Sequence, residues 1–123
     1  MNIHKNAPRF ENLIVWQKAQ RLALLIYEKS ATGPFAKDYP LKGQIRRAAI
    51  SIFSNIAEGQ GRFSPKEYRH YLSISNGSVY ELISQVHFAR KLGYLTAAES
   101  EAILNLCSET SKMIKGLRNS KMA

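Results

Sequence analysis

Apolar residues recur every three or four positions over most of the chain, a spacing that predicts helices. Four helices are expected, over about residues 12–30, 41–58, 64–93 and 96–117. Most of the proline and glycine residues fall in the connections, and no segment shows the alternation typical of a strand. The predicted fold class is therefore all-α, an antiparallel up-down-up-down four-helix bundle over residues 10–118, between flexible segments at 1–9 and 119–123.

Two of the predicted helices begin with a recognisable capping sequence. Ser64 is followed by Pro65 and, three positions on, by Glu67, so that a serine cap precedes a proline in the first helical position. Thr96 and Glu99 form a second pair at the same spacing, in which each side chain can bond the backbone amide of the other residue. These pairs predict where the third and fourth helices start.

The helices carry more apolar surface than one bundle core can bury. The fourth helix has a single apolar stripe, made of Ile103, Leu106, Cys107, Thr110, Met113, Ile114 and Leu117. The third helix has a core stripe and, on the opposite side, a second apolar set, Ile74, Phe88 and Leu92. Because contiguous exposed apolar patches usually mark association surfaces, we expect a homo-oligomer. Its predicted interface comprises Arg46, Phe53, Ile74, Phe88 and Leu92.

Arg46 is the most unusual cation in the chain. On the helical wheel it interrupts the apolar arc of the second helix, between Phe53 and Ala57. Either its long side chain extends past the core to solvent, or its guanidinium pairs across a subunit interface. We favour the interface.

Composition adds a strong positive charge to this picture. The 123 residues include 18 Lys and Arg against 9 Asp and Glu, a formal net charge of +9. Such a field favours nucleic acid, an anionic membrane or an acidic partner. No apolar run is long enough to span a membrane, and the N-terminus lacks the apolar core of an export signal. We expect a cytoplasmic protein with no membrane partner, and the single Cys107 suits a reducing compartment.

The positive charge gathers in clusters, which phosphate binding requires because each neutralised phosphate releases condensed counterion. One cluster lies at the turn between the second and third helices, and another follows the last acidic residue, Glu109, and includes Lys121. The predicted nucleic-acid-binding residues are Lys42, Arg47, Arg62, Lys66, Arg69, Lys112, Lys115 and Arg118. The alternative is a solvated basic surface that keeps a small protein soluble.

A row of polar residues follows one edge of the second helix at spacings of three and four: Gln44, Arg47, Ser51, Asn55, Glu58 and Arg62. Three interpretations remain open. The row is the wetted side of an amphipathic helix, or a ligand-binding surface, or part of a structural polar network. In the network, Arg47, Asn55 and Glu58 bond Glu81 or His87 of the third helix.

The chain lacks the common signatures of catalysis and metal binding. His4, His70 and His87 are too scattered for a metal site. The glycines at 59 and 61 follow a helix and lack the Lys-Ser/Thr of a phosphate-binding loop. Arg62 precedes His70 at a spacing that misses the pattern of small helical ribonucleases. We therefore expect no enzyme, no metal and no cofactor.

Residues 44–59, with the core Asn55-Ile56-Ala57-Glu58-Gly59, resemble the signature of the four-helix bundle proteins encoded by 23S rRNA intervening sequences. Phe10, Leu13 and residues 16–19 resemble the first helix of that family, and residues 77–78 and 81–82 its third. The similarity covers about residues 10–117. The family commonly has proline where this chain has Phe53, so the helix kink expected there is in question.

This resemblance implies a ring-like homopentamer with a nucleic-acid-binding role. The chain is also similar to the accessory variability proteins of diversity-generating retroelements, which share that pentameric barrel and associate with nucleic acid and a reverse transcriptase. Charge and resemblance together predict a non-enzymatic homo-oligomer that binds structured RNA or DNA through repeated basic patches. The alternative is an assembly scaffold that docks a protein partner such as a polymerase or reverse transcriptase.

Overall fold

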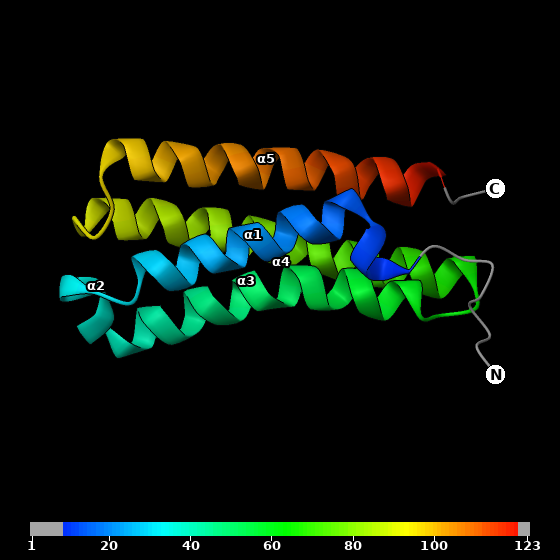
Figure 1. Ribbon diagram of the computed structural model, residues 1–123, viewed down its shortest axis with the longest axis horizontal. Coiled ribbons are helices and arrows are strands. Elements are labelled where there is room, and N and C mark those ends of the chain that lie inside the picture. The colour runs from blue at the N-terminus through cyan, green and yellow to red at the C-terminus, as the bar shows by residue number, and fades with distance from the viewer. Residues whose placement is uncertain (1–8, 121–123) are drawn as a thin grey trace.

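A computed structural model describes residues 9–120, and four long helices dominate it (Figure 1). They are α1 (Ile14–Lys29), α3 (Tyr39–Gln60), α4 (Pro65–Lys91) and α5 (Ala97–Ser120). Two short elements complete the described part, a 3-10 turn η1 (Phe10–Asn12) and α2 (Gly33–Lys37). The expected all-α fold is confirmed. The predicted flexible segments 1–9 and 119–123 fall largely outside the described residues, although α5 continues two residues past the predicted end of the bundle.

Successive long helices run in opposite directions, so that each connection joins neighbouring helices (Figure 1). α3 packs against α1 and α4, and α5 packs against α4 and α1. This arrangement matches the predicted up-down-up-down bundle. α1 begins, α3 ends, α4 begins and α5 ends at the same end of the molecule, and the opposite end holds α2 (Figure 1).

The Thr96–Glu99 pair is present in full, whereas the Ser64–Glu67 pair is present in part, because the Glu67 carboxylate makes no return bond to the Ser64 amide within residues 9–120. The Ser64 hydroxyl accepts a hydrogen bond from the Glu67 amide at 3.0 Å. At the start of α5 the Glu99 amide donates to the Thr96 hydroxyl at 3.1 Å, and the Thr96 amide donates to the Glu99 carboxylate at 2.8 Å. That backbone hydrogen bond is the main reason that the pKa of Glu99 is lowered. Both helices therefore start where local hydrogen bonding replaces the missing helical partners.

The connection between α1 and α3 contains the short helix α2, which the hydrophobic pattern does not predict. Phe35 of α2 is 2% exposed and stacks on Tyr94 with ring centroids 5.0 Å apart. The Tyr94 hydroxyl donates to Asp38 at 2.8 Å, and Asp38 also caps α3 by accepting from the Leu41 amide at 3.1 Å. α2 thus closes one end of the bundle through Phe35, whose partner Tyr94 is distant in the sequence and comes close only in the folded chain.

The core follows the predicted apolar stripes. On α5, all the predicted stripe residues are buried or half-buried. α3 and α4 approach closely through small residues: Ser51 and Ser78 share a hydrogen bond of 2.7 Å, and the Ser75 hydroxyl donates to the Ile52 carbonyl at 2.7 Å. Gly59 lies so close to α4 that an added Cβ would be 3.0 Å from the Tyr71 Cβ. α3 continues as one helix through Phe53.

Candidate nucleic-acid interface

The described residues contain many more cations than carboxylates to pair with them. Glu58 pairs with Arg62 at 2.8 Å and Glu109 with Lys18 at 2.8 Å, while Lys29 lies 3.1 Å from Glu99. Glu28 also pairs with Lys29, and Arg9 pairs with Glu11. Within residues 9–120, the Lys and Arg side chains with no carboxylate of that range within 4 Å are Arg21, Lys37, Lys42, Arg46, Arg47, Lys66, Arg69, Arg90, Lys91, Lys112, Lys115 and Arg118.

Five of these cations lie on the adjoining parts of α4 and α5, at the end of the bundle where α4 begins and α5 ends (Figure 1). We call this surface the α4–α5 basic face; its cations are Lys66, Arg69, Lys112, Lys115 and Arg118. Between residues 66 and 80, and between 110 and 120, Glu67 is the only acidic residue. Glu81 and Glu109 lie just outside these two ranges, and Glu109 pairs with Lys18, so the face keeps a net positive charge.

Neutral side chains of α4 position two of the α5 cations. The Arg118 guanidinium donates to the Ser73 hydroxyl at 2.9 Å. The Lys115 ammonium donates to the Tyr80 hydroxyl at 3.2 Å and lies 5.5 Å from the centre of its ring. That hydrogen bond, followed by the positive charge itself, lowers the pKa of Tyr80. Because neither partner is a carboxylate, no adjacent negative charge offsets either cation, and both head groups are held along α4.

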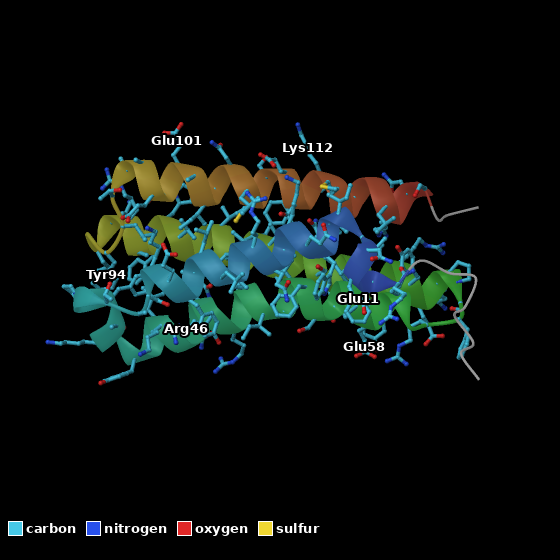
Figure 2. All side chains as sticks on the ribbon, viewed as in Figure 1. Glu11, Arg46, Glu58, Tyr94, Glu101 and Lys112 are labelled. Carbon is cyan, nitrogen blue, oxygen red and sulfur yellow. The ribbon has the colours of Figure 1, made fainter. Side chains whose placement is uncertain are left out.

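The remaining contacts of the face are also polar. Between the two helices, the Ser111 hydroxyl donates to the Asn76 side chain at 2.7 Å. Lys112 extends away from the bundle on the outer side of α5 (Figure 2). The arrangement offers ammonium and guanidinium groups to a polyanion together with hydroxyl and amide groups that can bond phosphate or sugar oxygens.

Sequence reasoning named the cations of this face but missed the neutral residues beside them. A signal was present in the chain, because polar residues follow one side of α4 at spacings of three and four: Lys66, Arg69, Ser73, Asn76 and Tyr80. Residues at such spacings share one line on a helix.

The structure separates Arg62 from the other predicted binding residues. Arg62 donates to Glu58 at 2.8 Å and to the Tyr71 hydroxyl at 2.8 Å, and its guanidinium lies 4.8 Å from the centre of the Tyr71 ring. Its Nε is buried with no hydrogen-bond partner. Arg62 therefore joins the end of α3 to α4, and its charge is offset by Glu58, unlike that of Lys66 or Arg69.

Lys42 and Arg47 lie on α3, which is not among the neighbours of α5, so they form a site apart from the α4–α5 basic face. Arg46, between them, makes contacts that neither sequence interpretation included. Its guanidinium donates to the Ser30 hydroxyl at 2.8 Å and to the Tyr27 carbonyl at 3.2 Å. It also lies 4.2 Å from the centre of the Tyr27 ring. Arg46 thus bonds a carbonyl in the last turn of α1 within its own chain.

The polar row reaches α4 through Ser51 and Arg62, which bond Ser78 and Tyr71, so the predicted network with Glu81 or His87 is wrong in its partners. The Asn55 amide donates to the Ser51 carbonyl at 2.8 Å and hydroxyl at 3.0 Å, and Glu58 pairs with Arg62. Arg47 and Glu81 are both exposed, and neither has a hydrogen bond or ion pair among residues 9–120. The polar contact of α3 with α4 in the middle of these helices is the hydrogen bond between Ser51 and Ser78.

The predicted interface residues divide into two groups. Phe53 is half-buried and contacts Trp16 edge to face, with centroids 6.2 Å apart, so it has a partner within the chain, as Arg46 does. Ile74, Phe88 and Leu92 are 38%, 55% and 43% exposed on the outer side of α4. The second group is the more exposed of the two, and the interface itself stays a prediction for both groups.

The described part of the chain contains no cluster of His, Cys, Asp and Glu that could hold a metal ion. His70 contacts the Tyr71 ring edge to face at 5.6 Å, His87 is exposed, and His4 lies outside the described residues. Burial raises the pKa of the Cys107 thiol to about 12, as expected for a core cysteine. No helix between residues 9 and 120 is long and apolar enough to cross a membrane.

Fold and surface together define an all-α bundle protein with an uncompensated basic face. The chain belongs to the 23S rRNA-intervening sequence protein family, whose model matches residues 11–116. It is similar in fold to a crystal structure of a protein of unknown function from the S23 ribosomal protein family of Bacteroides thetaiotaomicron, with a TM-score of 0.79 and 23% identity. The similarity covers 85% of this chain and 98% of that one. No curated protein sequence matches the chain.

Proposed function

We propose that the protein is a non-enzymatic homo-oligomer that binds structured RNA or DNA through the α4–α5 basic face. The observation that carries this proposal is the grouping of five cations, none within 4 Å of a carboxylate among residues 9–120, on the adjoining parts of two helices. A surface that served only solubility would need no such grouping, and it would gain nothing from the hydroxyl groups that hold Lys115 and Arg118 along α4.

The spacing of the cations suits a nucleic-acid backbone. Lys112 and Arg118 are six residues apart, which corresponds to about 9 Å along a helix. Duplex DNA carries one charge per about 1.7 Å of axis, so several phosphates fall within reach of three cations on that length. Each phosphate neutralised releases counterion, and this release is the main favourable term.

Assembly would multiply the effect. The outer side of α4 exposes Ile74, Phe88 and Leu92, and α1 exposes Ile14 and Leu24 at 62% and 65%. Such surfaces are typical of association, and the family resemblance favours a pentamer. Rotational symmetry would present one basic face per copy to the same polyanion, so that weak individual contacts add to a strong one.

The test is an electrophoretic mobility shift with a structured RNA and with duplex DNA. We expect shifts at low salt that weaken steeply between about 50 and 200 mM. Binding that is insensitive to salt, or no binding at low salt, would refute the proposal. Subunit number is measured on the same sample by light scattering, and a protomer that stays single at the binding concentration would refute the oligomeric part.

A second candidate function is a scaffold that docks a protein partner, and the exposed apolar set on α4 favours it. The resemblance to the accessory variability proteins of diversity-generating retroelements makes a reverse transcriptase the partner to try. Binding of a purified reverse transcriptase that persists after nuclease treatment, and that is lost when Phe88 is replaced by Asp, would favour this candidate over nucleic-acid binding.

A further inference from the structure

A second group of unpaired cations surrounds an open hollow between the end of α1 and the first turns of α3. We call it the α1–α3 hollow; it has a volume of about 400 Å³, and its lining residues are Tyr27, Tyr39, Lys42, Gly43, Arg46, Arg47 and Ile50. This volume falls in the lower part of the range for small-molecule sites. Figure 2 shows Arg46 on this part of α3.

The hollow is positively charged and contains no carboxylate. Lys42, Arg46 and Arg47 line it, and none lies within 4 Å of a carboxylate of residues 9–120. The nearest acidic residues in sequence have other partners, since Asp38 accepts from the Leu41 amide and the Tyr94 hydroxyl and Glu28 pairs with Lys29. Three like charges held together without a counter-charge point to an anionic ligand.

Two of the three cations are held in place by neutral groups. Arg46 is fixed by the Ser30 hydroxyl, the Tyr27 carbonyl and the Tyr27 ring. Lys42 donates to the Ala36 carbonyl at 3.2 Å and lies 5.4 Å from the centre of the Tyr39 ring. These contacts use one or two of the hydrogens on each head group and leave others for a phosphate. Because these contacts already restrict the two side chains, fixing them on ligand binding costs less conformational entropy.

The hollow also offers a flat apolar surface next to the cations. Tyr39 is 71% exposed, so its ring is accessible to a ligand. Gly43 has no side chain, and a Cβ added there would meet nothing within 4 Å, so the space beside Lys42 and Arg47 is open. An exposed ring beside unpaired cations is the combination that binds unpaired nucleotides, by stacking the base and neutralising the phosphate.

We infer that the α1–α3 hollow binds a nucleoside phosphate, with the phosphate on Lys42, Arg46 and Arg47 and the base stacked on Tyr39. A base-paired duplex does not fit this arrangement, because its bases are stacked on one another and do not offer a free face. The ligand is either an unpaired nucleotide within a strand or a free nucleotide. As a strand site, the inference rests on the proposed nucleic-acid-binding function and adds a preference for unpaired segments.

The test compares fluorescence anisotropy of a labelled single-stranded RNA of about 12 nucleotides, a common site size, with that of a duplex of the same length. The double variant Lys42→Ala/Arg47→Ala is measured against the control Arg90→Ala/Lys91→Ala, which removes two exposed cations of α4 that also lack a carboxylate partner. We expect the hollow variant alone to lose affinity for the single strand, with a salt slope smaller by about 1.4. Equal losses in the two variants would overturn the inference.

The base contact is tested by Tyr39→Ala and Tyr39→Phe. We expect Tyr39→Ala to weaken single-strand binding about 5- to 150-fold and Tyr39→Phe, which keeps the ring, to bind as the native protein does. A 5-iodouridine strand should cross-link to Tyr39 on irradiation. Unchanged binding by Tyr39→Ala would overturn the stacking.

A titration with adenosine monophosphate, followed by amide chemical shifts, separates the two sources of ligand. Shifts confined to the hollow in a protein that binds no strand would support a free-nucleotide site and refute the proposed function. A native protein that binds duplex, shows no preference for the single strand and gives no adenosine monophosphate shifts at the hollow would refute the hollow and leave the proposed function standing. If the protein binds neither the nucleotide nor any nucleic-acid strand, both the hollow and the proposed function are overturned.

Discussion

Replacing Lys112, Lys115 and Arg118 together by Gln is the most direct test of the α4–α5 basic face. The substitution removes three charges from about 9 Å of helix while keeping side-chain length and helix propensity close to the original. Because the partners of Lys115 and Arg118 are the neutral groups of Tyr80 and Ser73, no carboxylate is left unpaired. The fold of the variant should therefore be intact.

The magnitude follows from counterion release. If all three cations neutralise a phosphate, the slope of log affinity against log salt falls by about 2.7 for duplex DNA. Over a fourfold rise in salt, from about 50 to 200 mM, the native protein then loses about 40-fold more affinity per bound protomer than the variant does. The difference between the two proteins is largest at low salt.

The assay is a salt series of fluorescence anisotropy titrations with one labelled duplex. The matched control is Lys37→Gln/Arg90→Gln/Lys91→Gln, which removes the same charge from the opposite end of the bundle, where α2 lies and α4 ends. We expect the control to keep most of the native slope. If control and test variants show the same slope, the charge acts as a diffuse field and the α4–α5 basic face is not a site.

Three further predictions concern assembly, packing and the core thiol. Phe88→Asp places a charge on the exposed apolar set of α4 and should reduce the subunit number measured by light scattering. The control Glu101→Gln, on the outer side of α5, should leave the subunit number unchanged (Figure 2). An unchanged oligomer in Phe88→Asp would exclude this apolar set from the interface. Gly59→Ala should lower the free energy of unfolding by about 1 kcal/mol, because overpacking against Tyr71 exceeds the gain in helix propensity. Gly116→Ala, with open space around it, should raise the free energy of unfolding by about 0.5–1 kcal/mol in the same denaturant titrations. Stabilisation by both substitutions would contradict the close approach of Gly59 to α4. Burial raises the pKa of the Cys107 thiol to about 12 from an ordinary 9.0, so a disulfide reagent at about pH 8 should label it only as fast as the protein unfolds. The contribution of the buried thiol to stability should decline above about pH 9, where the thiol of the unfolded chain ionises. Rapid labelling of the folded protein would contradict the burial of the thiol.

The sequence alone determined the helices and the residues that face the core. Capping by Ser64 and Thr96 is decided within three residues, so it is visible as a short motif. The apolar stripe of α5 was equally visible, because each helix must bury one side whatever its neighbours are. The starts of α4 and α5 follow from such local rules.

The tertiary structure decided what each cation does, because partners from distant parts of the chain set its contacts. The sequence marks Arg46 as unusual and Arg62 as one member of a basic cluster, but it does not show their partners. In the fold, Arg46 bonds the end of α1 and Arg62 joins Glu58 to Tyr71. Phe35 similarly stacks on Tyr94, a residue distant in the sequence that only the folded chain brings beside α2. Helix formation depends on neighbours a few positions apart, whereas the pairing of charges depends on which helices meet and at what depth, and only the packed bundle determines that.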